Sequence, residues 1–224
     1  MKIRIMKINV ARRAGWLYLL LIPLGVFGIL FVPTYFIDPG NIENTINKIA
    51  NDELLFRMSI VSSLLTQVVQ IFVVLALYEL FKAVNKKMAL FMVISIMAAV
   101  PIAMLNELNY FALLESLGSP NHVDMYLNLH EYGVFIAQIF WGIWLFPMGW
   151  LAYKSGFIPK VIGVLLIIAC FGYIVDSFLV FLNVNIGVVF SDFTFLGEPA
   201  IVLWLLIKGT AITQHLNKLT TKNI

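Results

Sequence analysis

The residues of this chain that could do chemistry are acids and one histidine within or beside long apolar runs. They are Glu107, His130, Glu131, Asp176 and Glu198. An ionisable side chain costs about 2.5–3.5 kcal/mol at the centre of a membrane-spanning helix. Side chains that carry this cost face the protein interior or a water-filled cavity, and many of them mark the path of an ion, a proton or a polar ligand. These five residues are therefore the first candidates for a functional site.

Two further residues extend this set. Gln138 lies seven residues after Glu131, which places both on one helical face. That face is a stripe with steps of three and four, polar at one end and rich in glycine at the other: Asn128, Glu131, Phe135, Gln138, Gly142, Leu145 and Gly149. Arg57, at the start of an earlier apolar run, is the nearby cation. We expect all seven candidates to form one polar binding site below the outer membrane surface.

Two other interpretations remain open. In one of them, the buried polar groups serve only to hydrogen-bond one another and so fix helix packing, with each interaction contributing roughly 0.6–2 kcal/mol. Catalysis is the third interpretation, and motifs argue against it. The pair His130-Glu131 lacks the second histidine of H-E-x-x-H, and neither a G-x-S-x-G elbow nor a phosphate-binding loop occurs. We therefore predict no catalytic residue, no metal site and no cofactor.

The composition indicates that lipid surrounds most of this chain. Of the 224 residues, 61% are hydrophobic and 12% are charged, and the mean hydropathy is +0.94. Soluble domains carry about 25% charged residues, so this chain requires lipid around it. The basic leader is explained by topology and by contact with anionic headgroups, not by nucleic-acid binding. The expected partners are the lipid bilayer and a small polar ligand or ion.

A membrane span needs about 20 apolar residues. Six runs satisfy this requirement, and they predict an all-α bundle in a single domain, 1–224. The spans are approximately 14–36, 54–81, 88–114, 125–153, 158–183 and 197–215. The sixth is ambiguous: it begins either near Val188 or at Pro199, and proline at the first helical position favours the second alternative. Val188 to Leu196 would then be an apolar loop at the outer surface. Between the first two spans, the spacing of Ile42, Ile46 and Ile49 predicts a short amphipathic helix, with a polar loop as the alternative.

Lysine and arginine placement predicts the orientation. Of the fifteen such residues, thirteen fall on one side of the predicted spans, and only Lys48 and Arg57 fall on the other. Because the bias recurs at every loop, it predicts both termini in the cytoplasm.

Several segments resemble a bacterial membrane family known as domain of unknown function 4386. They are Arg13 to Tyr18, Leu55 to Arg57, Leu129 to Gly133, Tyr153 to Lys160, Gly172 to Ser177, Gly197 to Pro199 and Trp204 to Gly209. The resemblance implies a small multi-span protein of the bacterial cytoplasmic membrane, and it brings no activity, substrate or catalytic residue. Five of the candidate residues, Arg57, His130, Glu131, Asp176 and Glu198, fall in these segments.

From the sequence we expect a protein that binds or moves a small polar solute, proton or ion through an outward-facing pocket. A structural or sensory membrane subunit is the alternative, and a membrane-embedded, metal-dependent hydrolase is the third.

Overall fold

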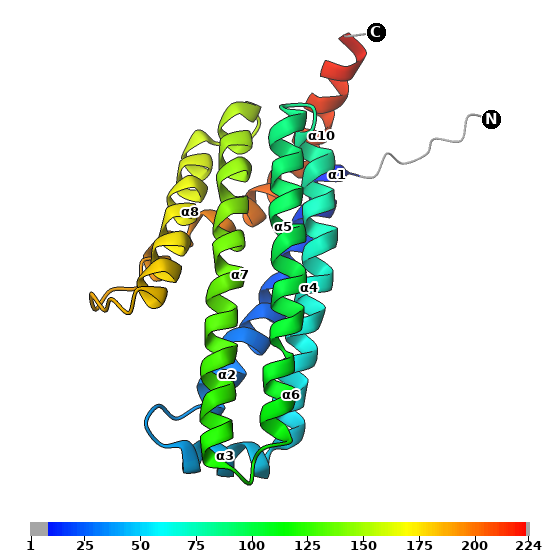
Figure 1. Ribbon diagram of the computed structural model, residues 1–224. Helices are drawn as coiled ribbons and strands as arrows, with labels where there is room; N and C mark the ends of the chain where they lie inside the picture. Colours follow the sequence, from blue (N-terminus) through cyan, green and yellow to red (C-terminus); the bar gives the residue numbers. More distant parts are fainter. Residues whose placement is uncertain (1–8, 223–224) are drawn as a thin grey trace, which may run out of the picture.

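The computed structural model describes the backbone of residues 9–222 and the side chains of residues 9–212. Helices account for most of this part of the chain, and six stretches are long and apolar enough to cross a membrane (Figure 1). The all-α, six-span fold class expected from the sequence is confirmed. The basic residues Lys2, Arg4 and Lys7 lie outside the described residues, and so do the side chains of His215, Lys218 and Lys222.

Two of the first three spans consist of more than one helical segment. Span one is continuous through three segments, α1 (Val10–Gly25), the π-helical η1 (Val26–Phe31) and α2 (Val32–Phe36). Span two is α4 (Glu53–Phe81). Span three consists of α5 (Lys86–Asn106) and α6 (Leu108–Leu114). The helix α5 runs through Pro101, and the interruption between α5 and α6 falls at Glu107.

The predicted amphipathic helix is present as α3 (Ile42–Asn51), and the polar-loop alternative is wrong. The Asn41 side chain caps it by accepting a hydrogen bond from the backbone N–H of Asn44. Thr45 and Ile49 are buried on the face that packs against the end of the bundle that the sequence predicts to face outward, which we name the outer end. This helix and the turn before it therefore close the outer end of the bundle.

The fourth and fifth spans, α7 (Pro120–Ser155) and α8 (Lys160–Phe181), pack closely against each other. A Cβ added at Gly149 would lie 2.6 Å from the carbonyl oxygen of Gly163, and the reverse holds for Gly163. The two backbones therefore touch, as the glycine end of the predicted stripe suggested. Near the other end of α8, the rings of Tyr132 and Phe181 lie 6.3 Å apart. The 36-residue α7 thus extends about twelve residues, or ~18 Å, beyond the 22-residue α8.

The sixth span is broken. The short α9 (Ser191–Thr194) precedes α10 (Gly197–Lys222), so the helix begins at Gly197, close to the predicted proline start. The sequence predicts that the loop before α10 stays at the outer surface. In the structure this loop instead runs along α8. Successive residues of this segment contact successive turns of α8. Ser191 contacts Asp176, Thr194 contacts Gly172, and Gly197 contacts Leu166. The chain therefore descends about ten residues of α8, or ~15 Å, before α10 begins part-way along the bundle (Figure 1).

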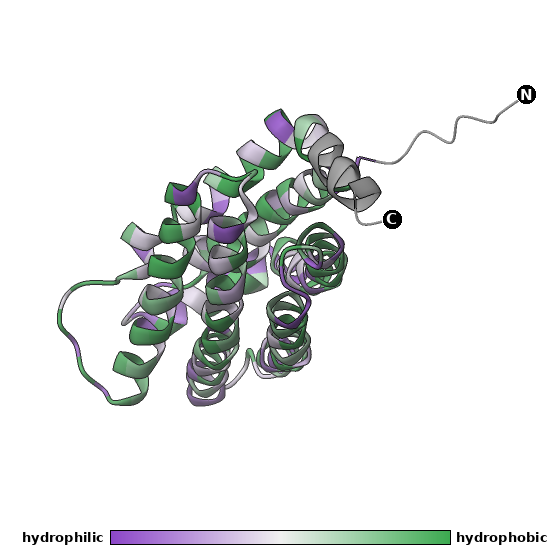
Figure 2. Cartoon of the chain, turned by 90° about the horizontal axis from the view of Figure 1, so that it is seen from above, coloured by the Kyte–Doolittle hydropathy of each residue, from purple (hydrophilic) through white to green (hydrophobic). Residues whose placement is uncertain are grey.

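Apolar side chains form two cores with a polar layer between them. The inner core contains Leu77, Ile96, Trp144 and Leu205, and the outer core contains Phe36, Phe56, Ile60 and Leu113. The polar layer comes from α4, from the junction of α5 with α6, and from α7: Ser63, Gln67, Asn106, Glu107 and His130. Apolar residues also cover the outward-facing sides of the helices (Figure 2), as a lipid environment requires. The candidate site lies where this polar layer meets the outer end of the bundle.

Candidate functional site

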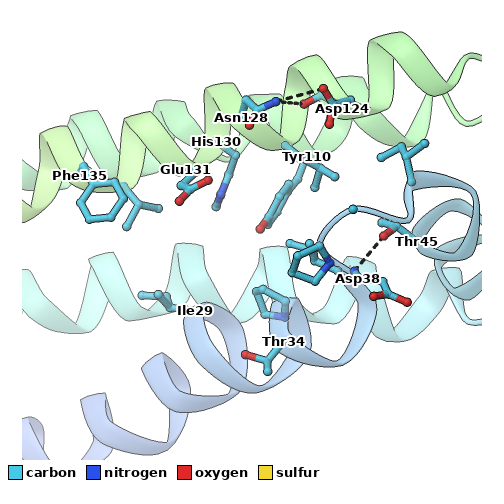
Figure 3. A pocket seen from close by; sticks show the side chains of 17 residues that line it. Ile29, Thr34, Asp38, Thr45, Tyr110, Asp124, Asn128, His130, Glu131 and Phe135 are labelled. Carbon is cyan, nitrogen blue, oxygen red and sulfur yellow. Dashed lines mark hydrogen bonds between the residues drawn. The ribbon is translucent and has the colours of Figure 1, made fainter. Parts of the chain in front are cut away.

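A cavity of about 890 Å³ opens between α7 and α6 on one side and the α2–α3 segment on the other (Figure 3). Its polar lining consists of Thr34, Asp38, Thr45, Tyr110, Asp124, Asn128, His130 and Glu131. Its apolar lining consists of Ile29, Pro33, Ile37, Pro39, Ile42, Leu127, Val134 and Phe135, and Gly40 completes it. Three acids line this cavity and no lysine or arginine does, so its electrostatic character is acidic.

The three acids differ in how they are held. Asp38 accepts a hydrogen bond of 2.6 Å from the Asn44 side chain, while its own backbone N–H donates to Thr45. Asp124 accepts from the Asn128 side chain, one helical turn away, at 3.2 Å. Within the part of the chain that the structure describes, the Glu131 side chain makes no hydrogen bond or ion pair. Glu131 is therefore the acid of this cavity that is available to a ligand.

His130 is fixed by contacts on several sides. Its ring stacks on Tyr110, with centroids 3.5 Å apart and planes 10° from parallel. Its backbone carbonyl accepts a 2.8 Å hydrogen bond from the Asn106 side chain, which packs against Gly133, where a Cβ would collide with it. Its Nε2 atom lies 3.5 Å from Glu107 Oε1. The imidazole is thus held between the cavity and the polar layer.

The structure therefore brings three of the seven predicted residues together. Glu131 and His130 line the cavity, and Glu107 lies directly behind His130. Glu107 and His130 are both buried, with side chains about one-tenth exposed. These residues belong to the third and fourth spans, and the cavity lies at the end of the bundle that the sequence predicts to face outward.

The other four residues lie elsewhere and have partners of their own. Arg57 forms an exposed ion pair with Glu53, one turn earlier on α4, at 2.6 Å. Gln138 donates a 3.1 Å hydrogen bond to the backbone carbonyl of Tyr173, which joins α7 to α8. Neither residue lines the outer cavity. A single site formed by five helices is therefore not what the structure shows.

Asp176 and Glu198 instead support the broken sixth span. Asp176 accepts hydrogen bonds from the backbone N–H groups of Phe190 and Ser191, at 2.8 and 2.7 Å. Irregular backbone within a membrane needs such internal partners, because no water is there to supply them. Glu198, in the first turn of α10, accepts hydrogen bonds from Tyr18 on α1 and Tyr173 on α8, both at 2.7 Å. Both acids thus satisfy specific local donors.

Several lining residues were not among the sequence candidates. Asp124 continues the predicted stripe, since it precedes Asn128 by four residues, and this spacing could have identified it. Asp38 and Thr45 come from the turn and the amphipathic helix, and no spacing rule links them to span four. Their position depends on how α3 folds back onto α7.

The donor types also limit the chemistry of the cavity. Among the described residues, no three histidine, cysteine, aspartate or glutamate side chains are grouped so as to hold a metal ion. The cavity instead combines separated carboxylates with aromatic and aliphatic walls. Such a lining can balance the charge of a cation and contact an organic group at the same time.

The chain is similar in sequence to one family of proteins. Residues 13–209 match the family described as Domain of unknown function (DUF4386). An uncharacterised protein of the archaeon Archaeoglobus fulgidus is 33% identical over 159 residues, which cover 70% of this chain and 86% of that protein. No solved structure matches the chain. The family resemblance noted in the sequence is confirmed, and the chain belongs to the DUF4386 family.

Proposed function

We propose that this multi-pass membrane protein binds a small organic cation in its outer cavity. One observation carries the proposal: a cavity of about 890 Å³ has three carboxylates and no lysine or arginine in its lining. Ligand cavities for small molecules measure about 300–1,000 Å³ and are mostly apolar, with a few placed polar groups. An amine that carries an apolar group fits this combination in both size and charge.

The lining favours an organic cation over a bare metal ion. Asp38 and Asp124 already accept hydrogen bonds from asparagines, and the described residues contain no metal-binding group. Phe135 supplies an aromatic ring, which attracts cations by about 0.5–2 kcal/mol when these lie over the ring face. Glu131 would form the central ion pair with the ligand.

The proposed location is the bacterial cytoplasmic membrane, with both termini in the cytoplasm. Among the described residues, Lys82, Lys86, Lys154 and Lys160 lie at the end of the bundle opposite the cavity. Positive residues gather on the cytoplasmic side of membrane proteins. In this orientation the cavity opens to the outside, where it would receive a solute from the surrounding medium.

A thermal-shift assay on purified protein in detergent tests the proposal. The probes are matched sets of similar size: alkyl and aryl amines, the corresponding neutral alcohols and the corresponding carboxylates. A ligand at ten times its Kd stabilises the folded state by about 1.4 kcal/mol, which corresponds to a Tm increase of roughly 3–6 °C for a chain of this length. We expect amines alone to raise the Tm.

The variant Glu131→Gln removes the available charge and should abolish the shift. Glu115→Gln is the matched control, because Glu115 is exposed at the end of α6 and does not line the cavity. Equal shifts with amines and alcohols would contradict a cation site, and so would an amine shift that survives Glu131→Gln unchanged.

The second candidate function is structural. It concerns residues outside the cavity, which hold separate helices together. Asp176 and Glu198 each bridge separate elements through hydrogen bonds of 2.7–2.8 Å. Their variants should lower folded yield without altering the response to amines.

A further inference from the structure

A second, much smaller cavity lies directly behind the outer one. It measures about 10 Å³ and is lined by residues of η1, α4, α5 and α7 and by Glu107 between α5 and α6: Ile29, Ser63, Gln67, Ala103, Asn106, Glu107, His130, Val134 and Trp141. Ile29, His130 and Val134 line both cavities. The two spaces therefore share one wall, and His130 is the titratable group in that wall.

Four buried polar atoms of the residues around this small cavity have no hydrogen-bond partner within the described structure. They are Gln67 Oε1, Glu107 Oε2, His130 Nε2 and Trp141 Nε1. Gln67, Glu107 and His130 are each less than one-tenth exposed. Buried polar atoms without partners are rare, because each loses the hydrogen bonds that it would make in water. Four such atoms around one cavity indicate a site for a small polar molecule.

The size of the cavity and the chemistry of the four atoms identify that group. A volume of about 10–15 Å³ holds one water molecule when two to four polar partners surround it. Water donates two hydrogen bonds and accepts two. Trp141 Nε1–H is a donor, and His130 Nε2 is another when the ring carries its N–H there, while the oxygens of Gln67 and Glu107 are acceptors. One water molecule therefore satisfies all four atoms at once.

We propose that this cavity is a binding site for a single water molecule, which links His130 to Glu107. The direct approach of His130 Nε2 to Glu107 Oε1 is 3.5 Å, which is too long for a strong hydrogen bond. The bound water supplies the connection that the two side chains do not make directly. Because His130 lines both cavities, this water would connect the wall of the outer cavity to Glu107. This inference does not depend on the proposed solute.

The neighbouring groups support a neutral water in place of a metal ion. Gln67 and Ser63 face the cavity from α4, Asn106 and Glu107 from the third span, and His130 and Trp141 from α7. Only Glu107 and His130 among these can carry charge, and Tyr110 and Glu131 lie on the far side of the imidazole. A tryptophan N–H cannot ligate a metal ion but readily donates to water.

The direct test is a density map of the full-length protein in lipid nanodiscs at a resolution that shows ordered water. We expect one peak within about 2.6–3.2 Å of all four atoms. An empty cavity would overturn the proposal. So would a rearrangement in which Glu107 and His130 bond directly and leave no space between them.

A coupling measurement gives an independent readout. Gln67→Leu and Trp141→Phe each remove one partner of the water, and each should lower the Tm by roughly 2–4 °C. Because either change already disturbs the same water, the double variant should lose less than the sum of the two. Gln70→Leu is the matched control: Gln70 is buried on the same helix but does not line this cavity. Its effect should add to that of Trp141→Phe, and additivity in both pairs would refute the shared water.

Discussion

Glu198 provides the sharpest test of how the broken sixth span is held. Its two carboxylate oxygens each accept one hydrogen bond of 2.7 Å, from Tyr18 and Tyr173. These tyrosines belong to α1 and α8, so the carboxylate joins three spans at the point where α10 begins. Replacing either tyrosine by phenylalanine removes one hydroxyl and leaves the ring in place.

The expected cost follows from the geometry. A hydrogen bond to a charged group contributes about 1.5–3 kcal/mol in soluble proteins, and interhelical bonds in membranes contribute about 0.6–1.7 kcal/mol. We therefore expect about 1–2 kcal/mol for Tyr18→Phe and the same for Tyr173→Phe. For a chain of this length, that loss lowers the Tm by roughly 2–8 °C. The double variant should lose at least the sum, because it leaves Glu198 with neither donor.

Thermal unfolding in a mild detergent, followed by tryptophan fluorescence, measures these shifts. Tyr35→Phe is the control, because Tyr35 is an exposed tyrosine on α2 that is 52% accessible. The reasoning is refuted if both phenylalanine variants melt with the wild type, or if the control loses as much as they do. The Glu198→Gln variant should fall between the wild type and the double variant, since an amide oxygen can still accept one of the two hydrogen bonds.

Three further predictions concern residues that hold the bundle together. Asp176→Asn leaves one oxygen for two backbone N–H groups, so limited proteolysis should cut the 184–196 loop faster, and an unchanged rate would contradict the capping role. Gly133→Ala drives a methyl group into Asn106 and should lower the Tm by several degrees, whereas Gly133→Ala combined with Asn106→Ala should recover part of the loss. Gly149→Val forces apart the backbones that touch at Gly163 and should abolish folded yield, and a well-folded variant would show that the helices can separate.

The membrane fold was predictable because it depends on local quantities. Length and apolarity locate the six spans without knowledge of their neighbours. The start of α10 at Gly197 followed from proline chemistry next to Pro199, and α3 followed from the spacing of its isoleucines. These features are encoded within single segments of chain.

The arrangement of the site was less predictable, because it depends on which helices are neighbours. Counting residues along each span estimates depth, and by that measure Glu107, His130, Asp176 and Glu198 all belong to the outer part of the membrane. Depth does not specify position around the bundle. Glu198 meets Tyr18 across 180 residues of sequence, on the α8 side of the bundle, while Glu107 and His130 meet on the other side of α7. No spacing rule connects such distant segments.

The unequal lengths of α7 and α8 have a consequence for how a solute arrives. At ~1.5 Å per residue, α7 measures ~54 Å, whereas the hydrocarbon layer is ~30 Å thick. Where the hydrocarbon layer covers the length of α8, the end of α7 that carries Asp124 and Asn128 lies outside that layer. A charged molecule dissolved in water can meet these acids without first partitioning into acyl chains. Capture at this rim requires no dehydration by the lipid, which removes the largest barrier that a permanent charge would otherwise face.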